Sequence, residues 1–130
     1  MTPNAPPPTA PSTGAFLLER LRKRSDFLRA AKAARAPAPG FLLQARQRHA
    51  DEEAPPGAIR VGFTCSKKVG NAVARNRAKR RLREIARLII SLEGRPGWDY
   101  VLVGRPEATA ALPFDQLKTD LSRALKKVHR

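Results

Sequence analysis

The part of this sequence most suited to chemistry is a run of basic residues, GNAVARNRAKRRLRE, at positions 70–84. Six residues from Arg75 to Arg83 carry a positive charge, and Glu84 is the only acid in the run. Like charges placed so closely on a helix repel one another, at a cost on the order of a few tenths of a kcal/mol per pair. The favourable hydrogen bonds that an arginine guanidinium donates in pairs to a phosphate can offset this cost. We therefore interpret the run as a surface that binds a polyanion.

Residues that could hydrolyse a phosphodiester are not gathered in any motif. Such hydrolysis on a protein needs metal-binding carboxylates or a well-placed acid–base pair. The acids lie in a proline-flanked loop or are scattered, and His49 and His129 are far apart in the chain. Cys65 alternates onto the same strand face as Val61 and Phe63, which is typical of a core thiol. We predict no catalytic residue and no metal held by protein side chains alone.

Composition indicates the class of partner. The 130 residues carry a formal net charge of +15, which favours nucleic acid or an anionic membrane surface. A membrane-surface helix pairs its basic face with Trp, Phe or Leu, whereas the apolar residues within the basic stretch 71–91 that would face the core are mostly Ala and Ile. No apolar run approaches the roughly 20 residues that span a bilayer, and the start lacks the pattern of a secretory signal. The charge and the lack of a membrane pattern therefore predict a nucleic-acid-binding protein with no membrane partner. The single cysteine, which allows no internal disulfide, predicts the reducing cytoplasm.

The chain divides into a tail and one domain. Residues 1–14 are rich in Pro, Ala and Thr and predict a disordered tail, and residues 15–130 predict one α+β domain. Ser25 or Asp26 begins a helix that ends by Arg35 before APAPG. The remaining predicted elements are strands at 41–48, 59–66 and 99–105 and helices at about 71–91 and 112–128. This order predicts a two-layer sandwich of a sheet and helices.

The basic helix has two faces when it is drawn at 100° per residue. The apolar stripe consists of Ala74, Ala78, Leu82, Ile85 and Ile89. Opposite it lie Arg80, Arg83 and Arg87, with Asn76, Arg77 and Lys79 on the flanks. Lys67 and Lys68 extend the basic surface to the preceding strand. Gly70 permits a tight turn, and Asn71 is a candidate N-cap.

The stretch RVGFTCSKKVGNAVARNRAKRRLRE, residues 60–84, resembles the central block of the protein subunit of bacterial ribonuclease P. The likeness rests on a strand that ends in Ser-Lys-Lys, then Gly-Asn-Ala-Val, then an Arg-Asn-Arg core at residues 75–77 followed by further Lys and Arg. RSDFLRA before it and DYVLVGRPEA after it extend the likeness to roughly residues 20–128.

The resemblance implies a fold of helix, three strands, helix, strand and helix, similar to domain 2 of ribosomal protein S5. It also implies a left-handed β-α-β crossover, against the general right-handed preference. By this likeness the enzyme is a ribonucleoprotein, in which the catalytic RNA removes the 5′ leader of precursor tRNA with magnesium bound mainly by the RNA. The protein is then the non-catalytic subunit, which binds the catalytic RNA and the leader and has no DNA partner.

The resemblance also implies roles for individual residues. Lys67, Lys68, Arg75, Asn76, Arg77, Lys79, Arg80 and Arg83 match the RNA-contacting motif, and the helical wheel adds Arg87. Phe27 matches an aromatic residue of the leader cleft between the first helix and the sheet. Ala31 and Gln44 stand where related sequences often have further aromatics, which leaves fewer surfaces for base stacking, worth roughly 1–3 kcal/mol per base.

Two other functions are consistent with a basic α+β domain. A stand-alone RNA-binding or ribosome-associated protein with the S5-like fold is the main alternative. A helix-turn-helix DNA-binding protein is disfavoured, because strands precede and follow the basic helix. Stimulation of precursor tRNA cleavage at low magnesium distinguishes the ribonuclease P subunit from both.

Overall fold

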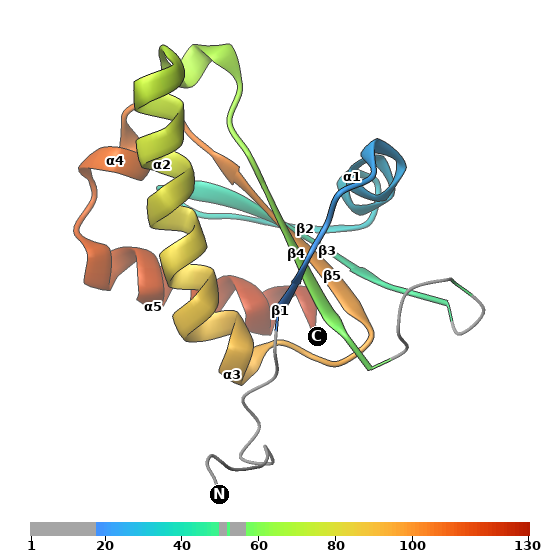
Figure 1. Cartoon of the computed structure of the whole chain (residues 1–130). Helices are drawn as coiled ribbons and strands as arrows, with labels where there is room; N and C mark the ends of the chain where they lie inside the picture. The colour runs from blue at the N-terminus through green and yellow to red at the C-terminus, as the bar shows by residue number, and fades with distance from the viewer. Residues whose placement is uncertain (1–17, 50–51, 53–56) are drawn as a thin grey trace, which may run out of the picture.

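The structure is a computed structural model that describes residues 18–49, 52 and 57–130, so the predicted tail lies outside the described residues. Its centre is a five-stranded sheet with the strand order β1-β4-β5-β3-β2 (Figure 1). The elements in chain order are β1 (Leu18–Arg20), α1 (Arg24–Ala31), β2 (Ala34–Pro37), β3 (Phe41–Gln47), β4 (Ile59–Thr64), the 3-10 turn η2 (Lys67–Val69), α2 (Ala72–Ile85), the π-helical turn η3 (Ala86–Ile90), α3 (Ser91–Glu93), β5 (Trp98–Gly104), α4 (Ala108–Ala111) and α5 (Phe114–Val128).

The sheet is mixed. β4 runs parallel to both of its neighbours, β1 and β5, whereas β3 is antiparallel to β5 and to β2. The chain passes from β4 to β5 through α2, η3 and α3. If the molecule in Figure 1 is viewed from the side of α2 with β4 pointing up, β5 lies to the left of β4. The connection is therefore left-handed, as the resemblance implied.

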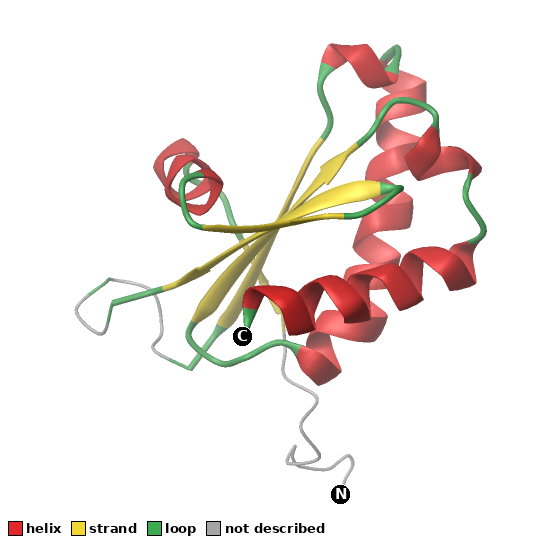
Figure 2. Cartoon of the chain, turned by 180° about the vertical axis from the view of Figure 1, so that it is seen from behind, coloured by secondary structure: helices red, strands yellow, loops and turns green. Residues whose placement is uncertain are grey.

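Helices cover both faces of the sheet. Figure 2 shows α1 alone on one side and the other helices on the opposite side. The main core lies between the sheet and the layer of α2 and α5, and Ile59, Val61, Phe63 and Cys65 of the β4 segment all face it, as predicted. The sandwich of sheet and helices is thus confirmed as an α+β domain, with α1 added on the second face.

The second face has a smaller core formed by Leu21, Ala30 and Val101, against which Phe27 packs. Gly62 of β4 makes this packing possible. A Cβ at Gly62 would lie 2.5 Å from a ring carbon of Phe27. The aromatic ring of α1 therefore rests directly on the backbone of β4.

The first helix is shorter than predicted. α1 spans Arg24–Ala31, and its N-cap position, Lys23, makes no side-chain cap hydrogen bond. Asp26 is buried instead of capping, with Oδ2 3.4 Å from Nη1 of Arg60. The chain leaves the helix early because β2 pairs with β3 from Ala34 onward, so pairing across the hairpin overrides the helical spacing of the alanines.

Strand β1 was not predicted. It is only three residues long, too short for an alternating pattern to show, and its partner β4 begins about forty residues later in the chain. The long basic helix and the C-terminal helix were predicted correctly, as α2 with its extension through η3 and α3, and as α5. Among the described residues, no helix combines the length and the apolar character needed to cross a bilayer.

Candidate nucleic-acid interface

The start of α2 is fixed by two residues that the sequence singled out. Gly70 has φ +140°, in the region that side chains disfavour. Asn71 follows as the N-cap, and its Oδ1 accepts a hydrogen bond of 2.9 Å from the backbone N–H of Ala74. Buried Ala78, Leu82 and Ile85 then hold α2 against the core. The basic side chains of the helix are therefore presented by a well-anchored element.

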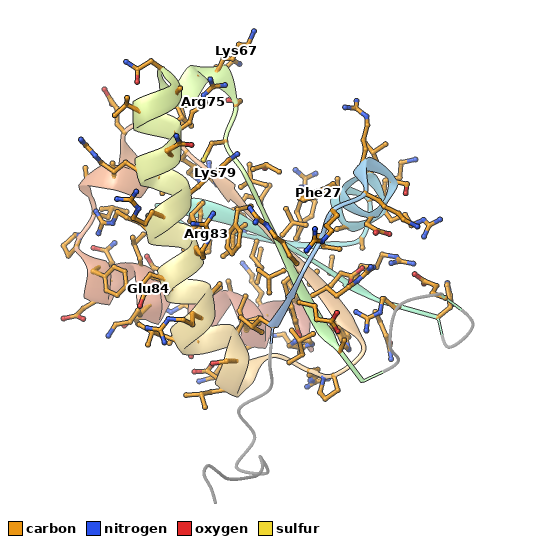
Figure 3. The ribbon with its side chains drawn as sticks, viewed as in Figure 1. Phe27, Lys67, Arg75, Lys79, Arg83 and Glu84 are labelled. Atoms are coloured by element: carbon orange, nitrogen blue, oxygen red, sulfur yellow. The ribbon has the colours of Figure 1, made fainter. Side chains whose placement is uncertain are left out.

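Three basic residues form a row along one edge of α2. Arg75, Lys79 and Arg83 recur every four residues, and Figure 3 shows them on the side of the helix that faces β4. The guanidinium of Arg83 lies 5.8 Å from the centroid of the Phe63 ring. We call these three residues the basic row.

The outer surface of α2 carries the remaining predicted contacts. Asn76, Arg77 and Arg80 are exposed to solvent. Lys67 and Lys68, also exposed, lie in η2 just before the helix, where the Ser66 hydroxyl accepts from the Lys68 N–H at 3.3 Å. The structure thus brings the predicted motif together as one continuous basic surface along η2 and α2.

Arg87 differs from the other predicted contacts because it has an acidic partner on its own helix. Its guanidinium hydrogen-bonds to both carboxylate oxygens of Glu84. This contact lowers the pKa of Glu84, through the hydrogen bond first and the charge of Arg87 second. The charge of Arg87 is therefore locally balanced, whereas the described part of the chain shows no ion pair to the basic row.

Arg81 is the one basic residue between Arg75 and Arg83 that the prediction omitted, and its contacts are internal. It donates hydrogen bonds to the backbone oxygens of Ala110 and Leu112, the latter at 2.7 Å. Its guanidinium also lies 5.9 Å from the centroid of the Phe114 ring. Arg81 therefore ties α2 to the segment that joins α4 and α5.

The residues expected in the leader cleft lie on the other face of the sheet. Phe27 on α1 is half-buried, and Gln44 of β3 is 9% exposed, opposite Val101 of β5. In the backbone alternation of β3, Gln44 points away from the face that Leu43 and Ala45 share with the main core. Both predicted residues thus face the α1 side, and Figure 3 shows Phe27 separated from the basic row by β4.

A buried ion network on this same face was missed from the sequence. Asp99 is fully buried and accepts hydrogen bonds from Arg60 at 2.8 and 2.7 Å and from Arg48 at 2.7 Å. Arg46 approaches the same carboxylate at 3.3 Å. Hydrogen bonding to Asp99 raises the pKa of Arg60. The signal available in the sequence was an aspartate that begins the apolar run DYVLV.

The cationic side chains of this basic surface are not the ligands that a magnesium ion prefers. Magnesium takes oxygen ligands, chiefly carboxylates and water, and the described part of the chain has no group of three His, Cys, Asp or Glu able to hold a metal. The site itself is lined by cations. Cys65 is half-buried at its edge, and burial raises the pKa of the thiol although Lys79 and Arg75 lower it. That shift disfavours the thiolate that a nucleophile needs.

Comparisons with known proteins agree with this geometry. A 61% identical relative, from Ruegeria pomeroyi, is named "Ribonuclease P protein component" and aligns over 95% of this chain and 96% of its own. A relative of the same name from Caulobacter vibrioides is 49% identical, with 89% of this chain and 73% of its own covered.

Solved structures show the same fold. The RNase P protein of Thermotoga maritima superposes with a TM-score of 0.64 at 27% identity, covering 85% of this chain and 97% of its own. The RNase P protein of Staphylococcus aureus gives a TM-score of 0.62 at 27% identity, with the same coverage. The family model for Ribonuclease P matches residues 18–129, that is, nearly all of the described chain. The chain therefore belongs to the ribonuclease P family of proteins.

Proposed function

We propose that this chain is the protein component of ribonuclease P and that it binds the catalytic RNA through the basic surface of η2 and α2. The observation that carries the proposal is the basic row, three cations on one edge of a capped helix, in a chain whose curated relatives are ribonuclease P protein components. Neutralising phosphates releases counterions, so about six such contacts would weaken roughly a thousandfold between 50 and 200 mM salt.

Precursor tRNA would be the second RNA partner. Its single-stranded 5′ leader would follow the face that carries Phe27, because an aromatic ring there offers a stacking surface. Gln44 offers no ring and little exposed area, so Phe27 would contribute most of the stacking. One chain can contact both RNAs because α1 and α2 lie on opposite faces of the sheet (Figure 1).

The hydrolysis itself would belong to the RNA subunit. The donor set of this protein offers cations where phosphates would lie, so any magnesium ion in the complex would be held mainly by RNA. The protein would then bind and position RNA and move no proton in the reaction. With the single Cys65 free, a reducing compartment such as the cytoplasm suits the protein.

Reconstitution tests this function. Cleavage of a precursor tRNA by ribonuclease P RNA is measured at low magnesium with and without the protein. We expect faster release of the 5′ leader when the protein is present. If the protein binds the RNA but leaves the cleavage rate unchanged, the alternative of a stand-alone RNA-binding protein is correct.

A further inference from the structure

A groove of about 260 Å³ lies between α2 and the edge of the sheet. Its floor is apolar, formed by Leu18, Val61 and Phe63, and Arg83 lies on the α2 side. We propose that this groove binds one unpaired nucleobase of the RNA whose phosphates contact α2. The inference rests on the proposed function in that it takes RNA as the partner, and it adds a base-binding site beside the phosphate contacts.

The floor of the groove is suited to stacking. The guanidinium of Arg83 is already held over the Phe63 ring at 5.8 Å. Both groups are planar, and bases stack on aromatic rings and on guanidinium planes alike. Phe63 is half-buried against the main core, so the platform is fixed in place before any ligand arrives.

The opposite wall offers hydrogen bonds from the backbone. β1 is an edge strand, and the Leu21 N–H donates to the carbonyl oxygen of Val61 at 3.0 Å. Backbone groups alternate in direction along a strand, so the N–H and C=O of Arg20 point away from β4. This donor and acceptor lie at the outer rim of the groove, where a base that extends past β1 would pair with them.

The charges around the groove select a nucleic acid. Arg20, Arg83 and Arg87 line the groove together with one acid, Glu19, and Glu84 pairs with Arg87, so the surroundings keep a net positive charge. The basic row reaches the groove at Arg83, and its members are spaced about 6 Å apart along the helix axis. A strand whose phosphates follow Arg75 and Lys79 would thus arrive with its next nucleotide at the groove. An apolar peptide could pack on the floor of the groove, but it would carry no phosphates to pair with Arg75 and Lys79.

The test separates base recognition from phosphate binding. We would measure the affinity of the full chain for a single-stranded RNA hexamer of adenylates and for an abasic hexamer with the same phosphates. The dissociation constant of the abasic hexamer divided by that of the adenylate hexamer reports base contacts alone. We expect Phe63→Leu and Arg83→Lys each to lower this ratio by about tenfold, since each removes half of the platform. Stacking at Phe27 is unchanged in both variants and cancels in the comparison.

Matched controls lie elsewhere in the fold. Phe114→Leu removes the other ring that an α2 arginine covers, and Arg123→Lys changes an exposed arginine of α5. Both should leave the ratio unchanged. Arg83→Lys keeps the charge at an exposed position, so it remains informative even if Phe63→Leu unfolds the domain.

Two results would overturn the proposal. If the variants weaken both hexamers equally, Arg83 contacts phosphate only. If they weaken neither, RNA does not enter the groove and its occupant is of another class. In either case, stimulation of precursor tRNA cleavage by the wild-type protein would still support the proposed function, so the two failures can be told apart.

Discussion

Asp99 shows how single residues set the strength of this fold. Its buried carboxylate accepts three hydrogen bonds of 2.7–2.8 Å from Arg60 and Arg48. Arg60 also reaches Asp26 of α1, so the network connects β4, β5 and the first helix. The buried Arg48 and the part-buried Arg60 thus share this one fully buried carboxylate, and removing one partner of a buried ion pair is costly.

Replacing Asp99 by Asn should therefore destabilise the protein strongly. The amide keeps the shape but removes the charge that both arginines share, and breaking such a buried ion pair costs about 3–5 kcal/mol. Urea unfolding followed by circular dichroism measures the change in the free energy of unfolding. The control is Asp115→Asn, whose carboxylate pairs with Lys118 on the surface and should matter by less than about 1 kcal/mol. Equal effects of the two changes would contradict the network.

At the scale of elements, the helix that carries the interface depends on its first turn. The side chain of Asn71 satisfies the N–H of Ala74, one turn before the basic row begins to repeat. Without that acceptor the first turn frays, and Arg75 loses its fixed position. The cap thus connects the local stability of α2 with the geometry of binding.

Asn71→Ala should lower the free energy of unfolding by about 1 kcal/mol, since the variant leaves a helix N–H without its acceptor. Chemical denaturation of the variant measures the change. Asn71→Ser is the matched control, because serine is also a good N-cap and should keep most of the stability. If the serine variant loses as much as the alanine variant, the capping hydrogen bond does not contribute.

The elements that local sequence predicts well are those with long, regular patterns. α2 and α5 each repeat their apolar residues over about four turns, and β4 alternates cleanly, so their faces were predicted correctly. β1 and β2 were not, because three or four residues carry little pattern and their pairing depends on distant partners. The inward role of Arg81 and the Asp99 network likewise depend on contacts between remote segments.

The candidate interface was predictable for the same reason. Apart from Lys67 and Lys68 of η2, its residues lie close together on one helix, so their spacing placed most of them on its solvent-exposed side. The groove beside Phe63 was not predictable from the sequence, since it forms only when β1 lies next to β4.

At the scale of the whole molecule, His129 links the end of α5 to the sheet. Its Nε2 lies 2.7 Å from the hydroxyl of Tyr100, which also accepts from the backbone N–H of Arg95 at 2.8 Å. The imidazole tautomer decides which of the two groups, the Tyr100 hydroxyl or Nε2 of His129, donates in this hydrogen bond. Trp98 packs edge-on at 4.4 Å between ring centroids. Burial lowers the pKa of His129, and the charge of Arg95 lowers it further.

The free energy of unfolding should therefore decline as the pH falls below the pKa of an ordinary histidine. A histidine with a lowered pKa in the folded state stabilises the fold fully above about pH 6.5, its unfolded value, and loses that contribution as the pH falls through the folded pKa. Thermal melts at pH 7.5 and 5 measure the loss. His129→Gln should remove this part of the pH dependence, whereas His49→Gln, at an exposed position, should keep it. A wild-type pH dependence that survives in His129→Gln would contradict this role.

We propose that the basic row, rather than overall charge, allows this chain to stimulate precursor tRNA cleavage. The most direct measurement is precursor tRNA cleavage at low magnesium with ribonuclease P RNA and two charge-matched triple variants. One variant replaces Arg75, Lys79 and Arg83 by alanine, and the other replaces the exposed Arg123, Lys126 and Lys127 of α5. We predict that the first variant remains folded but loses the stimulation, while the second keeps most of it. Equal loss in both variants would show that net charge alone accounts for RNA binding and would contradict the α2 interface.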